Sequence, residues 1–140
     1  MSEIYNPSEN SFSGAAQKKI LVADDETHIL NVVSMKLRNA GYIVLTASDG
    51  QEAYDTAIAE LPDLFITDYH MPLLNGLEVC QKLRADARTA GIPAIMLTAR
   101  GYNLEPSDTE SGGIRCMLSK PFSPRQLLQT VTEVLSGIAA

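Results

Sequence analysis

The sequence has little that would place the chain in a membrane, on nucleic acid or on a secretory route. Its 140 residues contain no apolar run that approaches the roughly 20 residues needed to span a bilayer. The first residues lack the basic and apolar regions of a signal peptide. The formal net charge is -6, so no basic excess favours contact with nucleic acid or an anionic membrane surface. We therefore expect a cytoplasmic protein that contacts neither a membrane nor nucleic acid through this chain.

Cysteine is also scarce. The two cysteines, Cys80 and Cys116, both lie within apolar patterns. Disulfide frameworks and zinc sites usually show more cysteines, or cysteines paired with histidines at short spacing. We interpret both as small core residues rather than as a disulfide or a metal pair.

The length and composition predict one globular domain. With 45% hydrophobic residues, the chain can bury one sizeable core but hardly two. Residues 1–17 are rich in Ser, Asn and Glu and carry no sustained periodicity, so we expect a disordered N-terminal leader there. The domain itself is expected over residues 18–140.

Within this domain, strand-like and helix-like segments alternate, which is typical of an α/β fold with a parallel sheet. Apolar runs predict five strands, at 19–23, 42–47, 64–67, 94–98 and 116–119. Apolar residues at helical spacing predict helices at 26–39, 49–59 and 74–85. A last helix is expected to begin after Ser123, with Pro124 at its first position and Gln126 completing a capping box.

The segment between the last two strands is the weakest part of the pattern. Residues 105–113 include no large apolar side chain, and Pro106 would cost about 3 kcal/mol inside a helix. A helix that starts at Pro106 avoids this cost but is short and polar. We predict a short or poorly ordered fourth helix, held to the sheet by Tyr102, Leu104 and Ile114.

Polar residues follow four of the predicted strands. Asp24 and Asp25 follow the first, Asp68 the third, Thr98 ends the fourth and Lys120 follows the fifth. Right-handed crossovers bring the carboxyl ends of consecutive parallel strands to one edge of the sheet. Ligands bind at that edge in open α/β folds. We therefore expect these five side chains to meet in one site.

Three carboxylates in one site favour a bound cation, because like charges within a few Å disfavour ionisation. Oxygen ligands with room for water suit Mg²⁺. We expect Asp25, Asp68 and the backbone carbonyl of His70 to bind Mg²⁺ directly, while Asp24 holds a metal-bound water.

A carboxylate oxygen of Asp68 can then attack a phosphoryl group in line, and no general base is needed. The metal and Lys120 would neutralise the phosphoryl charge. Thr98 would donate its hydroxyl to a phosphoryl oxygen. The predicted chemistry is therefore phosphoryl acceptance on Asp68.

Four motifs together resemble the receiver domain of bacterial two-component response regulators, within the CheY-like superfamily. They are Asp24-Asp25, the run from Asp68 through Met71 and Pro72 to Gly76, Thr98-Ala99, and Lys120-Pro121-Phe122. Each motif is weak alone, but four in order at the spacing of this family are highly specific. The similarity covers roughly residues 18–135.

This resemblance implies a flavodoxin-like (βα)5 three-layer sandwich with a five-stranded parallel sheet of order 2-1-3-4-5. It implies Mg²⁺-dependent phosphorylation of Asp68 by a histidine kinase or phosphotransfer protein, and slow self-dephosphorylation by water. Such a chain is a signalling protein rather than an enzyme, although it catalyses both steps on itself. Its downstream protein target is unknown, and a homodimer is among the assemblies that the resemblance allows.

Two features depart from the family pattern. Receivers usually carry Tyr or Phe three residues before the lysine, where this chain has Met117. Methionine lacks the rigid ring that gives two discrete positions, so signalling here would not follow the usual coupling from threonine to aromatic residue. A tolerated core substitution is the alternative. The polar segment at 105–113 is the second departure. We hypothesise that phosphorylation orders it, or that output uses another surface such as the first helix.

Two further residues are candidates for setting the lifetime of the phosphoryl group. His70 and Arg100 lie two residues after Asp68 and after Thr98, where side chains line the path of an attacking water. Both positions are equally compatible with ordinary exposed loop residues.

Other classes stay open at this point. A phosphatase of the haloacid dehalogenase type also uses an aspartate nucleophile, but normally on the first strand with a second acid two residues later, an order that Asp24-Asp25-Glu26 lacks. A flavodoxin-like nucleotide or flavin binder would need a glycine-rich loop after the first strand, which this sequence does not have. A degenerate receiver that acts as a phosphorylation-independent interaction module is the closest rival. We expect a single-domain regulator, with a receiver cut from a longer protein as the alternative.

Overall fold

The computed structural model of the chain describes residues 17–99 and 104–137. Apart from Gln17, the predicted leader at 1–17 lies outside the described residues, and so do Arg100 and Tyr102. The Gln17 side-chain amide donates a hydrogen bond to the carbonyl of Gly41 over 2.8 Å.

Five strands alternate with five helices along the described chain, as predicted. The elements are β1 (Lys19–Ala23), α1 (Thr27–Asn39), β2 (Ile43–Ala47), α2 (Gly50–Glu60), β3 (Leu64–Asp68), α3 (Gly76–Ala85), β4 (Ala94–Thr98), α4 (Pro106–Gly112), β5 (Ile114–Ser119) and α5 (Pro124–Leu135).

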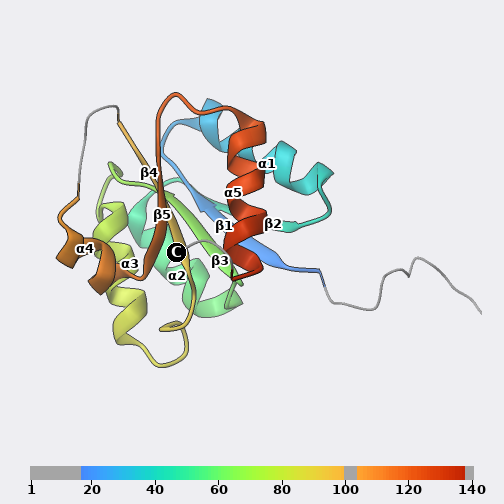
Figure 1. Ribbon diagram of the computed structural model, residues 1–140. Helices are drawn as coiled ribbons and strands as arrows, with labels where there is room; N and C mark the ends of the chain where they lie inside the picture. Colours follow the sequence, from blue (N-terminus) through green and yellow to red (C-terminus); the bar gives the residue numbers. More distant parts are fainter. Residues whose placement is uncertain (1–16, 100–103, 138–140) are drawn as a thin grey trace, which may run out of the picture.

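The strands form one parallel sheet in the order β2-β1-β3-β4-β5. Helices α1 and α5 cover one face of this sheet, and α2, α3 and α4 cover the other (Figure 1). The three-layer, flavodoxin-like arrangement expected from the resemblance is therefore confirmed.

The core consists of two clusters, one on each face of the sheet. Phe65 and Met96 pack on the side of α2 and α3, whereas Ile66 and Leu97 pack on the side of α1 and α5. All five residues of β3 and all five of β4 are buried. Strands covered on both faces are apolar at successive positions, which explains why these segments are continuous apolar runs in the sequence.

The two cysteines belong to opposite faces of the sheet. Cys80 is buried in the cluster beneath α2 and α3, and Cys116 packs against the other cluster. Both are free thiols, and burial raises the pKa of the Cys80 thiol to about 12. The interpretation as a core residue is confirmed for Cys80, whereas Cys116 is partly buried at the edge of its cluster.

The start of α3 was predicted two residues too early. This helix begins at Gly76 rather than near Leu74, because Asn75 forms a complete capping box with Glu78. The Asn75 side chain accepts from the Glu78 amide and the Glu78 carboxylate accepts from the Asn75 amide, each over 2.8 Å. At α5 only half of the predicted box forms among the described residues, where the Gln126 amide donates to the Ser123 hydroxyl over 3.0 Å.

The fourth helix is short, as predicted. It comprises seven residues, starts with Pro106 and ends at Gly112. The cap residue Gly113 follows with φ 67°, a left-handed conformation that favours glycine. Its apolar anchors lie at its flanks, where Leu104 and Ile114 pack on the cluster beneath α2 and α3.

Two glycines fix the loop that follows β3, at residues 69–75. The Gly50 amide donates to the Pro72 carbonyl over 3.1 Å, and the Gly76 amide donates to the Tyr69 carbonyl over 2.8 Å. A Cβ atom on Gly76 would overlap the carbonyl oxygen of Asp68, and one on Gly50 would overlap the carbonyl of Leu74. The loop can therefore lie close to α2 and α3 only because both positions lack a side chain.

We predict that Gly76→Ala lowers the free energy of unfolding by about 1–3 kcal/mol, because the added methyl group forces backbone apart in a packed region. Urea denaturation measures this difference. Gly91→Ala is the matched control: a Cβ there would meet nothing within 4 Å, so its effect should stay within about 0.5 kcal/mol. Equal effects of the two substitutions would contradict the role assigned to Gly76.

Candidate functional site

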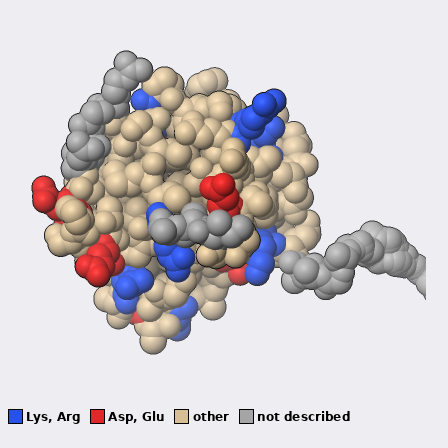
Figure 2. All heavy atoms as spheres, viewed as in Figure 1, with Lys and Arg blue, Asp and Glu red and all other residues tan. Residues whose placement is uncertain are grey.

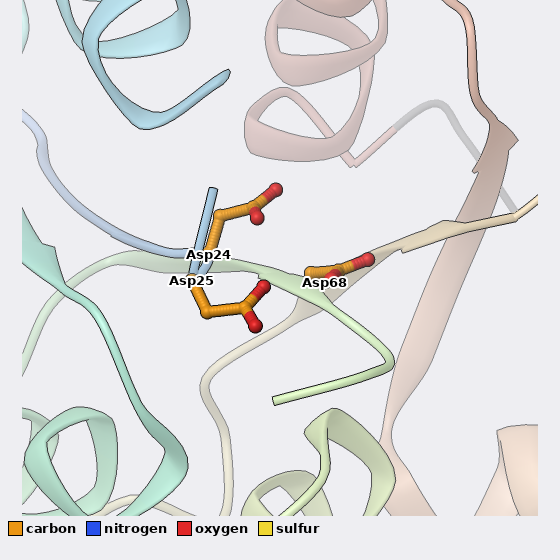
Figure 3. A group of neighbouring side chains, drawn as sticks. All are labelled: Asp24, Asp25 and Asp68. Carbon is orange, nitrogen blue, oxygen red and sulfur yellow. The ribbon is translucent and has the colours of Figure 1, made fainter. Parts of the chain in front are cut away.

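The polar residues predicted to converge lie together at the carboxyl edge of the sheet. Asp24 and Asp25 follow β1, and Asp68 is the last residue of β3. Each offers a carboxylate oxygen, and these oxygens all lie within 4.8 Å of one another. Figure 3 shows the three side chains projecting from the neighbouring ends of the two strands.

The Lys120 ammonium joins this cluster from the loop after β5. Its Nζ atom lies 3.1 Å from Oδ2 of Asp24 and 3.3 Å from Oδ1 of Asp68. A third carboxylate, Glu26, lies nearer still, with Oε1 2.7 Å from Nζ. The predicted meeting of Lys120 with the acids is confirmed, and Glu26 is an additional partner.

Sequence analysis missed Glu26 because it was assigned to the start of the first helix. In the structure it precedes α1 as the cap residue, with an extended backbone. The signal was present, since a third acid directly follows Asp24 and Asp25. Hydrogen bonding to Lys120 lowers the pKa of Glu26 below its usual value.

Asp24 is the most enclosed member of the cluster. Its side chain is fully buried, and Oδ1 accepts a hydrogen bond from the Glu26 amide over 2.9 Å. Burial raises the pKa of Asp24, while the hydrogen bonds from the Glu26 amide and from Lys120 oppose this rise. Asp24 is thus held in place by the groups that stabilise its charge.

The pKa of Asp68 is raised well above its usual value. Burial, followed by repulsion from Asp24, raises the pKa of Asp68 to about 6, although Lys120 opposes the rise and Asp25 adds to it. Burial alone would lower the pKa of Lys120, but the hydrogen bonds to Glu26 and Asp24 raise it instead. The cluster therefore has more negative than positive charge, and its oxygen donors fit a hard divalent cation.

Thr98 ends β4 beside the cluster and is buried. Its carbonyl accepts a hydrogen bond from the Lys120 amide over 2.8 Å. In the sheet register Thr98 pairs with Ser119, the residue before Lys120. The backbone thus fixes Lys120 relative to Thr98, as the convergence of strand ends requires.

Three further candidate residues, His70, Met117 and Arg100, were proposed to act in switching and phosphoryl lifetime. His70 is exposed in the loop after β3, and its ring meets that of Tyr69 edge-on, with centroids 4.8 Å apart. Met117 is half-buried on β5, opposite Met96 of β4, and packs on the cluster beneath α2 and α3. Arg100 lies outside the described residues. The proposed roles of these three residues in switching and lifetime stay predictions.

A groove of about 490 Å³ opens beside Lys120, between α1 and the start of α5. Its walls are largely apolar and include Val32, Phe122 and Pro124, and Glu26 and Lys120 also line it. The ion pair between Glu26 and Lys120 therefore borders a concave surface.

No helix in the described part of the chain has the length and apolar character needed to cross a membrane. On the face drawn in Figure 2, acidic and basic side chains of the described residues are interspersed rather than gathered by sign.

The family model of the response regulator receiver domain matches residues 20–132. Among curated proteins, the chain is 42% identical over 125 residues to the alkaline phosphatase synthesis transcriptional regulatory protein PhoP of Bacillus subtilis, covering 88% of this chain and 51% of that protein. It is 39% identical to the DNA-binding dual master transcriptional regulator RpaA of Synechocystis, covering 84% of this chain and 48% of RpaA. The chain thus spans about half the length of these curated relatives.

Solved structures of similar proteins share the fold over nearly their whole length. The chemotaxis response regulator CheY4 of Vibrio cholerae superposes with a TM-score of 0.79 at 34% identity, covering 85% of this chain and 99% of CheY4. A CheY-like receiver domain protein of Methanospirillum hungatei gives a TM-score of 0.79 at 29% identity, covering 88% and 97%. Taken with the acid cluster and the lysine beside it, these matches show that the chain belongs to the response regulator receiver family of two-component systems.

Proposed function

We propose that this chain is a phosphorylation-dependent signal receiver that accepts a phosphoryl group on Asp68 from a histidine kinase or phosphotransfer protein. The observation that carries the proposal is the position of Asp68, a carboxylate at the end of β3 with two acids and the Lys120 ammonium around it. Phosphorylation of Asp68 then changes a surface that an unknown protein target recognises.

The donor set fits Mg²⁺, which this proposal requires. Asp25, Asp68 and the backbone carbonyl of His70 would hold the ion directly, and Asp24 would hold one of its waters. When bound, Mg²⁺ offsets the carboxylate repulsion and the negative charge of the phosphoryl group. Burial, followed by repulsion from Asp24, raises the pKa of Asp68 to about 6, so a cation that offsets the negative charge would stabilise this site.

The residues divide the transfer step among them. A carboxylate oxygen of Asp68 forms a bond to phosphorus while the phosphorus–nitrogen bond of a phosphohistidine breaks, and the leaving imidazole nitrogen takes up a proton. Lys120 places its positive charge on the phosphoryl oxygens. Thr98 donates its hydroxyl to one of them. Asp68 needs no base because it is already ionised above its pKa.

Hydrolysis of the aspartyl phosphate limits the signal. Water attacks its phosphorus, the bond from phosphorus to the Asp68 oxygen breaks, inorganic phosphate leaves with the protons of the water, and the carboxylate is regenerated. His70 and Arg100, by their places after Asp68 and Thr98, are the side chains proposed to set this rate. The chain acts on itself in both directions, so we propose a signalling protein rather than an enzyme with a separate substrate.

The proposed output is protein contact in the cytoplasm, with a homodimer as one form it can take. Net charge -6 and the interspersed charges in Figure 2 support this over direct nucleic-acid contact by this domain. The names of PhoP and RpaA as transcriptional regulators describe proteins about twice as long as the matched segment. The surface that changes would include the short α4, on the side of the sheet where Met117 packs, or else the first helix on the other side.

Incubation with acetyl phosphate tests the proposal directly. Intact-mass measurement should show one added phosphoryl group on the wild type with Mg²⁺, and none without it. Asp68→Asn should gain none in either condition, because the amide is not a nucleophile. An unmodified wild type that still binds Mg²⁺ would contradict the proposal and indicate a phosphorylation-independent interaction module.

A second prediction follows from the raised pKa of Asp68. In the metal-free protein, Asp68→Asn should be more stable than the wild type at pH 7.5 by about 1–3 kcal/mol, because it removes a charge that the folded state disfavours. The native state binds the proton more tightly than the unfolded state, so the cost of the charge appears as pH rises from about 4 to 6. Below that window the two proteins should converge.

Urea denaturation in EDTA, repeated across this pH range and then with Mg²⁺, measures the difference. Added Mg²⁺ should narrow it, since the ion stabilises the wild-type cluster. Asp55→Asn on α2 is the control. The exposed carboxylate of Asp55 accepts a hydrogen bond from the Gln51 side chain, away from the site. An Asp68→Asn protein less stable than the wild type at pH 7.5 without metal would contradict the account.

A further inference from the structure

We infer that Glu26 is a positioning residue that competes with the phosphoryl group for the Lys120 ammonium, and so restrains phosphorylation of Asp68. This inference rests on the proposed function and adds a residue to it. Among the described residues, it concerns the one carboxylate in contact with Lys120 that has no place in metal binding or nucleophilic attack as set out above.

The Lys120 ammonium already contacts several carboxylates. An ammonium has three donors and no acceptor. Three carboxylates surround it, with Nζ to oxygen distances of 2.7 Å for Glu26, 3.1 Å for Asp24 and 3.3 Å for Asp68. Before any phosphoryl group arrives, Nζ donates hydrogen bonds to Glu26 and Asp24, and its contact with the nucleophile Asp68 is an ion pair at the longest of the three distances.

Exposure indicates which of these contacts can be exchanged. The Asp24 side chain is fully buried, so losing its ammonium would leave an unpaired charge in the interior. The Glu26 side chain is 60% exposed, and water can replace the ammonium there at little cost. As Lys120 turns toward phosphoryl oxygens, the contact with Glu26 is the one that lengthens.

Charge adds to the effect of geometry. Glu26 and Lys120 line the same groove between α1 and the start of α5. A carboxylate 2.7 Å from Nζ cancels part of the positive charge that Lys120 would otherwise present to a phosphoryl group. Removing that carboxylate should therefore strengthen binding of the phosphoryl group as well as speed its arrival.

The test is Glu26→Gln, which keeps the shape of the side chain and removes its charge. With Mg²⁺ present, we expect phosphorylation by acetyl phosphate to become about two- to fivefold faster, in keeping with the modest strength of an exposed ion pair. Beryllofluoride, a phosphoryl mimic, should bind tighter by a similar factor. An unchanged or slower reaction would overturn the inference.

Glu60→Gln is the matched control. Glu60 is also an exposed carboxylate paired with a lysine, Lys19, at 3.4 Å, but it lies at the end of α2. Glu60→Gln should leave the phosphorylation rate and the beryllofluoride affinity unchanged. Equal changes in Glu26→Gln and Glu60→Gln would indicate a general effect of lowering the net negative charge and would overturn the inference.

A double-mutant cycle separates action through Lys120 from simple repulsion of the phosphodonor. If Glu26 acts through Lys120, Glu26→Gln should not change the beryllofluoride affinity of a Lys120→Ala protein. A change that persists there would assign the effect to charge alone and overturn the inference.

In the metal-free wild type, the Lys120 ammonium signal in ¹⁵N NMR should be protected from exchange and should weaken in Glu26→Gln. An unaltered signal would also overturn the inference.

The outcome for the wild type keeps the two proposals distinct. If the wild type takes up no phosphoryl group, the proposed function fails. If the wild type is modified on Asp68 and Glu26→Gln is modified at the same rate, only the role of Glu26 fails.

Discussion

The excess of carboxylates over ammonium groups at the carboxyl edge of the sheet is the constraint on which the site depends. Asp24, Asp25 and Asp68 repel one another within 4.8 Å, and a single lysine offsets only part of that repulsion. A packed backbone holds the charges together, since the Gly76 contact fixes the loop after Asp68 and a backbone hydrogen bond ties Lys120 to β4. We propose that a bound cation relieves the repulsion that the fold maintains, and that phosphoryl acceptance on Asp68 depends on this.

Much of this could be predicted from the sequence because the signals were local. Central strands buried on both faces are continuous apolar runs, so β1, β3 and β4 were found within a residue or so of their bounds. Parallel order then required their carboxyl ends to share one edge, which brought Asp68 to Asp24 without knowledge of any distance. Pro106 and its polar neighbours likewise predicted the short α4.

Other features could not be predicted because they depend on tertiary contacts. The side chain of Glu26 contacts Lys120, 94 residues away. A third acid directly after Asp24 and Asp25 is visible in the sequence, but its distant partner is not. The start of α3 was misplaced since Leu74 continues an apolar pattern that only the Asn75 cap interrupts. Ser123 has the expected capping sequence, yet the Gln126 side chain does not return its half of the box.

A crystal structure of the wild type with Mg²⁺ and beryllofluoride would show whether the carboxylate cluster holds the metal and whether Asp68 accepts the phosphoryl group. We expect one Mg²⁺ held by Asp25, Asp68 and the His70 carbonyl, and beryllofluoride on an Asp68 oxygen within hydrogen-bond reach of Lys120 and Thr98. Beryllofluoride absent from Asp68, or a metal bound away from the three carboxylates, would contradict this expectation.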